Sequence, residues 1–184
     1  DAAVVGYISS IVEYEGIDTL INAFSKLRQS GEDAWLLLVG DGPVRQNLEK
    51  TVTALGIQHR VVFTGRVAHE SVLDYYSVID LFVVPRRNRA VCRLVTPLKP
   101  FEAFSTGRVV VLSDVDALQE IAGQSGAAEV FTADDPDSLA DCLRSLLHDE
   151  DRRHALAERG AAWTRAQRSW DAIAAKYLSP YDEL

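Results

Sequence analysis

The sequence has 184 residues, of which 27 are acidic and 19 basic, and a formal net charge of -8. This charge excludes non-specific binding to nucleic acid through a basic surface. The two cysteines and four histidines form no CxxC or HxxxH spacing, which excludes a disulfide framework and a zinc site. No apolar run approaches the roughly 20 residues that cross a bilayer, and no secretion signal is present. We therefore expect a cytoplasmic protein.

Six short apolar runs, rich in β-branched residues, recur along the chain and predict strands. These runs are Ala3–Ile8, Trp35–Val39, Val61–Thr64, Leu81–Val84, Val109–Leu112 and Glu129–Phe131. Segments of helical periodicity follow them, at Ile17–Leu27, Val44–Leu55, Ser71–Val78, Lys99–Ser105, Ala117–Ala122 and Asp137–Leu147. Continuously apolar strands are typical of a parallel sheet that helices cover on both faces. The sequence predicts an α/β fold with a doubly wound, Rossmann-like parallel sheet of about six strands.

From Asp149 the pattern becomes polar and helix-rich, and it predicts two further helices, Asp149–Arg159 and Trp163–Tyr177. The bulky residues of the second helix are Trp163, Trp170, Ile173 and Tyr177. We expect residues 1–148 to form the Rossmann-like domain and residues 149–184 to be its helical C-terminal extension. The chain starts at Asp1 without methionine and enters an apolar run at once, which suggests an excised fragment.

Open parallel sheets bind ligands at the carboxyl ends of their strands, so the loops after the first three strands are candidate binding segments. Polar strand-to-helix loops offer backbone N–H groups to a phosphate, and glycine allows a ligand to approach the backbone. The main chain after the third strand could also read the hydrogen-bonding rim of a base. Capped loops and plain turns remain the alternative. The candidates are Gly6, Ser9, Ser10, Gly40, Gly42, Gly65, Arg66 and Val67.

The segment after the fourth strand carries four arginines and one lysine, with no acid before Glu102. Arginine and lysine suit a diphosphate, through bidentate and point-charge contacts respectively. Glu102 is placed to accept hydrogen bonds from the vicinal hydroxyls of a ribose. The candidates in this segment are Arg87, Arg93, Thr96, Leu98, Lys99 and Glu102. The alternative is a solvated basic loop.

Two other patterns give weaker signals. Asp114-Val115-Asp116 could chelate a divalent metal, but its place before a predicted helix favours a helix cap. Cys142 lies among leucines at helical spacing, which indicates packing. The histidines have no serine or acid at a spacing that supports a nucleophilic triad. We therefore expect no metal site.

Three segments together resemble the C-terminal domain of GT-B glycosyltransferases of the large group called family four. They are Leu38–Pro43 with its following helix, Val61–Val67 followed by a helix with Tyr75-Tyr76, and Pro97–Phe104 before Gly107 and a Val-rich strand. Ser113-Asp114 and Glu120-Ile121 continue the pattern. The resemblance extends over residues 3–178.

The resemblance implies an enzyme that moves a sugar from a nucleoside diphosphate to an acceptor hydroxyl, with retention and without a metal or other cofactor. By position, Glu102 would hold the ribose hydroxyls, the backbone of Gly65–Val67 would face the base, and the Gly6–Ser10 loop would lie near the diphosphate. Lys99 and Glu102 are the catalytic candidates. The acceptor site would belong to an N-terminal domain of the parent chain, absent here, to which the tail helices cross back. The isolated chain would then be inactive, and contact with the inner face of a membrane would run through that other domain.

The sequence departs from the family pattern at the phosphate-binding positions. Relatives carry an arginine after the first-strand glycine and a lysine before the second loop glycine, where this chain has Tyr7 and Glu15. The earlier acid of the paired-glutamate motif is also missing, because Leu94 stands eight residues before Glu102. We hypothesise that Arg87, Arg93 and Lys99 supply the positive charge instead.

Other functions remain open at this point. A non-catalytic or regulatory binding module of the same fold is favoured by Tyr7 and Glu15 and opposed by Glu102 and the basic segment. Half of a nucleotide-sugar epimerase is a second alternative. A dinucleotide-dependent oxidoreductase is disfavoured, because the glycine fingerprint after the first strand is absent.

Overall fold

The computed structural model describes residues 2–169, 172 and 174. Within them, six parallel strands form one sheet in the order β3-β2-β1-β4-β5-β6. The strands are β1 Ala3–Ile8, β2 Ala34–Val39, β3 Val61–Gly65, β4 Leu81–Val84, β5 Val109–Ser113 and β6 Ala128–Phe131. The order reverses between β1 and β4, so the sheet is doubly wound, as predicted.

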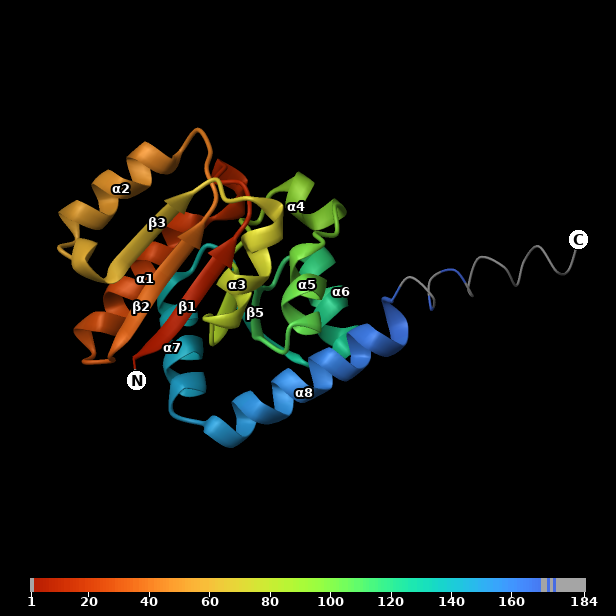
Figure 1. The fold of residues 1–184 in the computed structure, drawn as a ribbon. Helices are drawn as coiled ribbons and strands as arrows, with labels where there is room; N and C mark the ends of the chain where they lie inside the picture. The colour runs from red at the N-terminus through yellow and green to blue at the C-terminus, as the bar shows by residue number, and fades with distance from the viewer. Residues whose placement is uncertain (1, 170–171, 173, 175–184) are drawn as a thin grey trace, which may run out of the picture.

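Eight α-helices are present in the described part of the chain (Figure 1). They are α1 Ile17–Gln29, α2 Arg45–Ala54, α3 Val72–Ser77, α4 Ala90–Leu94, α5 Lys99–Ser105, α6 Asp116–Ser125, α7 Pro136–Leu147 and α8 Glu150–Gln167. Short 3₁₀ turns lie at Glu13–Glu15, Gln58–Arg60 and His69–Ser71. Most predicted helices are confirmed with ends that differ by one to three residues, where helix ends fray.

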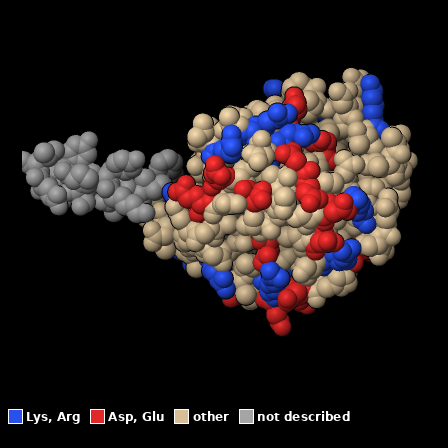
Figure 2. All heavy atoms as spheres, turned by 180° about the vertical axis from the view of Figure 1, so that it is seen from behind, with Lys and Arg blue, Asp and Glu red and all other residues tan. Residues whose placement is uncertain are grey.

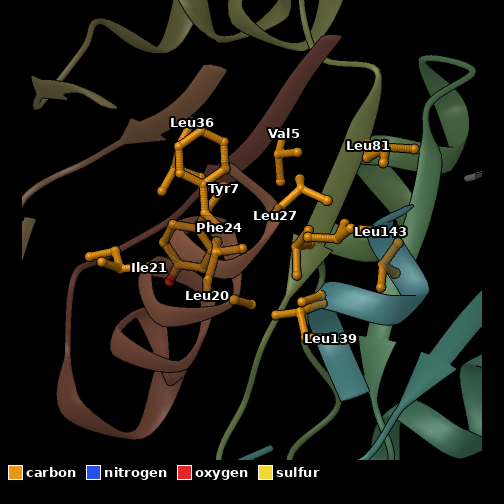
Figure 3. Close-up of a cluster of buried hydrophobic side chains, with 14 of the residues drawn as sticks. Val5, Tyr7, Leu20, Ile21, Phe24, Leu27, Leu36, Leu81, Leu139 and Leu143 are labelled. Atoms are coloured by element: carbon orange, nitrogen blue, oxygen red, sulfur yellow. The ribbon is translucent and has the colours of Figure 1, made fainter. Parts of the chain in front are cut away.

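Side chains on the two faces of the sheet form two separate cores, because successive residues of a strand point to opposite faces. On one face, helices α1, α2 and α7 pack on alternate strand residues such as Val5 and Leu36; Phe24 of α1 and Leu143 of α7 are fully buried there (Figure 3). On the other face, α3, α5 and α6 cover residues such as Phe82. Burial on both faces explains why the strands are continuously apolar.

The C-terminal helix differs from the sequence prediction. We predicted a break between Arg159 and Trp163, but α8 runs without interruption through Gly160. Gly160 lies against the ring of Phe104, where a Cβ atom would overlap that ring. This glycine is therefore a packing contact with α5 and not a helix break. The predicted helix residues Trp170, Ile173 and Tyr177 lie outside the described residues.

A second difference concerns the basic segment, which we expected to be a loop up to Lys99. Residues Ala90–Leu94 form the short helix α4, with Cys92 buried against the core. Burial of this one side chain stabilises a helix too short to show a periodic pattern in the sequence.

None of the helices in the described residues is both long enough and apolar enough to cross a membrane.

Candidate functional site

The carboxyl ends of β1, β2 and β3 surround a shallow hollow of about 260 Å³. Figure 1 shows these strand ends as the arrowheads of the three strands. The walls of this hollow include six residues from the three loops, namely Ser9, Ser10, Gly40, Asp41, Arg66 and Val67. Five of these are predicted binding residues, so the structure brings together segments that lie far apart in the sequence. Gly6, in contrast, lies buried inside β1, where a Cβ atom would overlap Ile79.

Glycines bring the backbones of these loops close together. Gly40 has a φ of 135°, a conformation that side chains rarely adopt, and a Cβ atom there would overlap the carbonyl oxygen of Ser9. Its N–H donates a hydrogen bond of 3.0 Å to the carbonyl of Gly65. A Cβ atom at Gly42 would likewise overlap the carbonyl oxygen of Ile11. The three loops are therefore fastened to one another through their main chains.

A larger hollow of about 800 Å³ lies between the β3–α3 loop, α3 and α5. Three of its residues come from α3, namely Val72, Leu73 and Tyr76. Three come from α5, namely Phe101, Glu102 and Ser105, and Leu98 directly precedes that helix. His69 and Glu70 form part of its rim, and Arg66 and Val67 of the same loop line the smaller hollow. The β3–α3 loop thus borders both hollows, which makes them neighbours along one edge of the sheet.

Glu102 is the only carboxylate that α5 contributes to the larger hollow. Its Oε2 atom accepts hydrogen bonds from Lys99 Nζ at 2.8 Å and from the Tyr76 hydroxyl at 3.2 Å. Burial, followed by the nearby Glu102 charge, raises the pKa of Tyr76 above its ordinary value, so this hydroxyl remains a proton donor. Among the described residues, no donor contacts Oε1 of Glu102, which is free to bind a ligand hydroxyl.

The basic segment is less positive than its sequence indicates, because acids, most of them from other segments, pair with several of its cations. Arg87 forms ion pairs with Asp18 and with Asp134, the latter at 3.2 Å. Lys99 pairs with Glu102. On the face opposite to that in Figure 1, acidic and basic side chains alternate without a large area of one sign (Figure 2). A strongly positive cluster beside Glu102 does not form.

The structure separates the residues that we expected to act together on a diphosphate. Arg87 lines a different hollow of about 210 Å³ between α1 and α2. Arg93 and Thr96 are exposed and lie outside the lining of the two neighbouring hollows. Of the cations expected to bind the diphosphate, Lys99 is the one in contact with Glu102. Their role in phosphate binding remains a prediction.

Sequence reasoning missed the buried cation of this edge, Arg86. It is 9% exposed, and its guanidinium contacts Glu15 Oε1 through Nε at 3.1 Å and Nη2 at 2.9 Å. Glu15 is 6% exposed, and its Oε2 accepts a hydrogen bond of 3.3 Å from the Tyr7 hydroxyl. Glu15 is buried while Glu13 of the same loop is exposed, so the sequence alone does not single out Glu15 as the acid that needs a counter-charge.

The Asp114-Val115-Asp116 segment is not the side-chain helix cap that we expected. The residue at the start of α6 is Val115, and no side chain caps this end. Asp114 Oδ1 instead accepts a hydrogen bond of 2.7 Å from the backbone N–H of Ala133. This carboxylate joins the loop after β5 to the loop after β6. The described residues contain no group of three or more His, Cys, Asp or Glu side chains that could hold a metal.

Comparison with known proteins identifies the family. Residues 1–163 match the family described as Glycosyl transferases group 1. The chain belongs to this glycosyltransferase family. It is 32% identical over 171 residues to a GDP-mannose-dependent alpha-(1-6)-phosphatidylinositol monomannoside mannosyltransferase of Mycobacterium tuberculosis, a match that covers 92% of this chain and 44% of that protein. The chain therefore spans about half the length of such group 1 relatives.

Solved structures of other proteins share the fold. Sucrose-phosphate synthase from Thermosynechococcus elongatus matches with a TM-score of 0.84 and 27% identity, over 100% of this chain and 45% of that one. Anabaena HepE, solved in complex with UDP, matches with a TM-score of 0.83 and 20% identity, over 100% of this chain and 49% of that one. This chain therefore has the GT-B Rossmann-like architecture that its sequence motifs indicated.

Proposed function

We propose that this chain binds the nucleoside diphosphate sugar of a glycosyltransferase, which transfers the sugar to an acceptor hydroxyl with retention and without a metal. The observation that carries the proposal is the position of Glu102. Its carboxylate lies in the wall of an apolar hollow at the ligand-binding edge of a doubly wound sheet, with one oxygen held and the other free. A carboxylate so placed can accept hydrogen bonds from two vicinal ribose hydroxyls.

The larger hollow suits a nucleoside. Its volume of about 800 Å³ lies within the usual range of small-molecule pockets, and its walls are mostly apolar with few polar groups. A flat base would lie between the β3–α3 loop and the apolar side chains of Leu98 and Phe101, with its ribose toward Glu102. The base edge would then face the main chain near Val67.

The smaller hollow suits the diphosphate. It adjoins the nucleoside hollow through the β3–α3 loop, and Ser9, Ser10 and Gly40 are among its lining residues. Its catalytic contribution would be electrostatic stabilisation of the departing diphosphate. Since Tyr7 and Glu15 contact each other, the exposed cation Arg66, which lines the smaller hollow, would supply positive charge.

The names of two similar proteins support two classes of donor. The Mycobacterium tuberculosis relative is named as GDP-mannose-dependent, and the HepE structure contains UDP. We therefore propose a GDP- or UDP-linked hexose as the donor substrate. The acceptor, and any contact with a membrane, would be provided by a further domain, because the relatives are about twice as long as this chain. On its own, the chain would bind donor without transferring sugar.

The proposal is tested by calorimetric titration with UDP and GDP and with their 2′,3′-dideoxy analogues. The wild-type protein should bind at least one natural nucleotide and bind its dideoxy form about tenfold more weakly, because hydrogen bonds to a charged group are lost. Glu102→Ala should bind both forms equally and weakly. Glu158→Ala, which removes an exposed acid of α8, is the matched control and should retain the discrimination. Absence of nucleotide binding by wild type refutes the proposal.

One observation favours a second function, a binding module without turnover. The cations Arg86, Arg87 and Lys99 are all paired with acids, which lowers the electrostatic stabilisation available to a leaving diphosphate. Release of nucleoside diphosphate from radiolabelled donor sugar by the natural full-length protein distinguishes the two functions. Binding without release would establish the module.

A further inference from the structure

The buried side chains of Tyr7, Glu15 and Arg86 form a continuous polar network at the carboxyl edge of the sheet. The carboxylate of Glu15 is its centre. Its Oε1 atom accepts a hydrogen bond from Arg86 Nε and forms an ion pair with Arg86 Nη2, and its Oε2 atom accepts a hydrogen bond from the Tyr7 hydroxyl. Tyr7 belongs to β1, Glu15 to the 3₁₀ turn before α1, and Arg86 follows β4 directly. The network therefore joins two neighbouring strands of the sheet.

Each end of the network holds the backbone of a loop in the proposed donor site. The Tyr7 hydroxyl contacts the carbonyl oxygen of Ser10 at 2.9 Å, in the loop that lines the smaller hollow. Arg86 Nη1 donates a hydrogen bond of 2.8 Å to the carbonyl oxygen of Val95. Val95 lies four residues before Lys99, where α5 begins, so this bond holds the segment that leads to the larger hollow.

The base of the Arg86 side chain is fixed as well. The Ser113 hydroxyl of β5 donates a hydrogen bond of 2.7 Å to the main-chain carbonyl of Arg86, and Ser113 is fully buried. The planar guanidinium then contacts a carboxylate with two of its nitrogens and a carbonyl with the third. A lysine ammonium is a point charge and cannot span these acceptors in the same geometry.

We infer that Arg86 is a positioning residue of the donor site, which holds the loop leading into α5 against the loop that follows β1. This inference rests on the proposed function. Arg86 acts through the backbone of Val95, while Glu15 compensates its charge and directs its guanidinium. Tyr7 and Glu15, which replace the cations common in relatives, thus serve the site by fixing its loops and not by binding phosphate.

The substitution Arg86→Lys tests the inference, because it retains the charge opposite Glu15 and removes the bond to Val95. The matched control is Arg153→Lys: Arg153 Nη1 also joins two main-chain carbonyls, those of Leu146 and Leu147, but at the opposite edge of the sheet. Affinity for UDP and GDP is measured by calorimetry, and folding by thermal melting. We expect Arg86→Lys to weaken nucleotide binding about tenfold, as small displacements of binding groups do. Arg153→Lys should stay within about twofold of wild type, because it is remote from the site.

A triple variant separates positioning from stability. Tyr7→Phe/Glu15→Leu/Arg86→Met removes the whole network, and such replacement of a buried ion pair by apolar residues of similar size is often neutral for stability. Weak nucleotide binding by this folded variant supports the inference, whereas wild-type affinity in either it or Arg86→Lys overturns it. If wild type binds neither nucleotide, the proposed function fails; if wild type binds and the variants bind equally well, only the inference fails.

Discussion

The hydroxyl of Tyr76 in α3 donates a hydrogen bond of 3.2 Å to Oε2 of Glu102 in α5. Tyr76 is almost completely buried, and its ring packs at 5.4 Å from that of Phe82 in β4. The position of the carboxylate is therefore set by a ring that is itself fixed in the core. Lys99 contacts the same oxygen from one turn earlier in α5. These two donors hold Oε2 of Glu102, a residue that lines the larger hollow.

Removal of this hydroxyl should loosen Glu102 without disturbing the core. Tyr76→Phe retains the ring and deletes one hydrogen bond worth about 1 kcal/mol, which corresponds to about fivefold weaker nucleotide binding if the bond orients the carboxylate. The loss should be smaller for 2′,3′-dideoxy nucleotides, which cannot use Glu102. Tyr75→Phe is the neighbouring control. Equal affinities of wild type and Tyr76→Phe in calorimetry would show that Glu102 needs no such support.

Gly160, the single glycine of α8, should not tolerate replacement by alanine. A methyl group there would overlap the ring of Phe104, so Gly160→Ala should lower the free energy of unfolding by about 1–3 kcal/mol. Gly123 in α6 has open space around its Cα, and Gly123→Ala should instead stabilise the protein by roughly 0.5–1 kcal/mol through helix propensity. Urea denaturation of both variants measures the difference. Stabilisation by Gly160→Ala would mean that α8 is not seated on α5.

Replacement of Gly40 by alanine should destabilise the protein more than the same replacement at Gly56, another glycine with positive φ. Gly40→Ala would place a Cβ atom on the carbonyl oxygen of Ser9, whereas Gly56→Ala at φ 71° meets no atom within 4 Å. Gly56→Ala should cost about 1–2 kcal/mol of stability from backbone strain alone. Gly40→Ala should cost more and should also weaken nucleotide binding, because the loops of the smaller hollow must separate. Thermal melting and nucleotide titration in parallel test this, and equal effects of the two variants would contradict it.

The thiol of Cys142 should react slowly with alkylating agents in the folded protein. Burial, followed by the charge of Glu129, raises its pKa to about 12, so the reactive thiolate is scarce at pH 8. The rate of reaction with iodoacetamide should still rise about tenfold per pH unit between pH 8 and pH 10. Peptide mass spectrometry follows the modification, and the urea-unfolded protein serves as control. A rate that levels off near pH 8.5 would indicate an ordinary exposed thiol.

The central strands could be predicted from sequence because they are buried on both faces, as the fully buried β4 and β5 show. Leu36 and Leu38 face one core while Val39 faces the other, and a short run that is apolar on both faces is typical of a strand inside a covered parallel sheet. The continuous α8 could not be predicted, since Gly160 resembles a helix breaker until Phe104 is known to lie against it. The short α4 depends in the same way on the burial of Cys92.

The candidate site was only partly predictable. The polar loop residues and Glu102 could be recognised because their place after a strand indicates the ligand-binding edge. The pairing of Arg87 with Asp18 and Asp134 could not be predicted, because these acids are 69 and 47 positions away in the sequence. Counting cations in one segment says nothing about the acids that the fold places beside them. For this reason the sequence indicated a positive cluster that the folded protein largely neutralises.

Arg168, just after the end of α8, lies over the rings of Phe101 and Trp163, at 5.1 Å and 5.4 Å from their centroids, and lines the larger hollow together with Glu102. The family match ends at residue 163, five positions before this arginine. A version of the protein trimmed to that boundary would retain the sheet but would lose one wall of the larger hollow, in which we place the nucleoside. On the proposed function, the end of α8 would therefore form part of the donor site, and shortened versions of the chain should keep it.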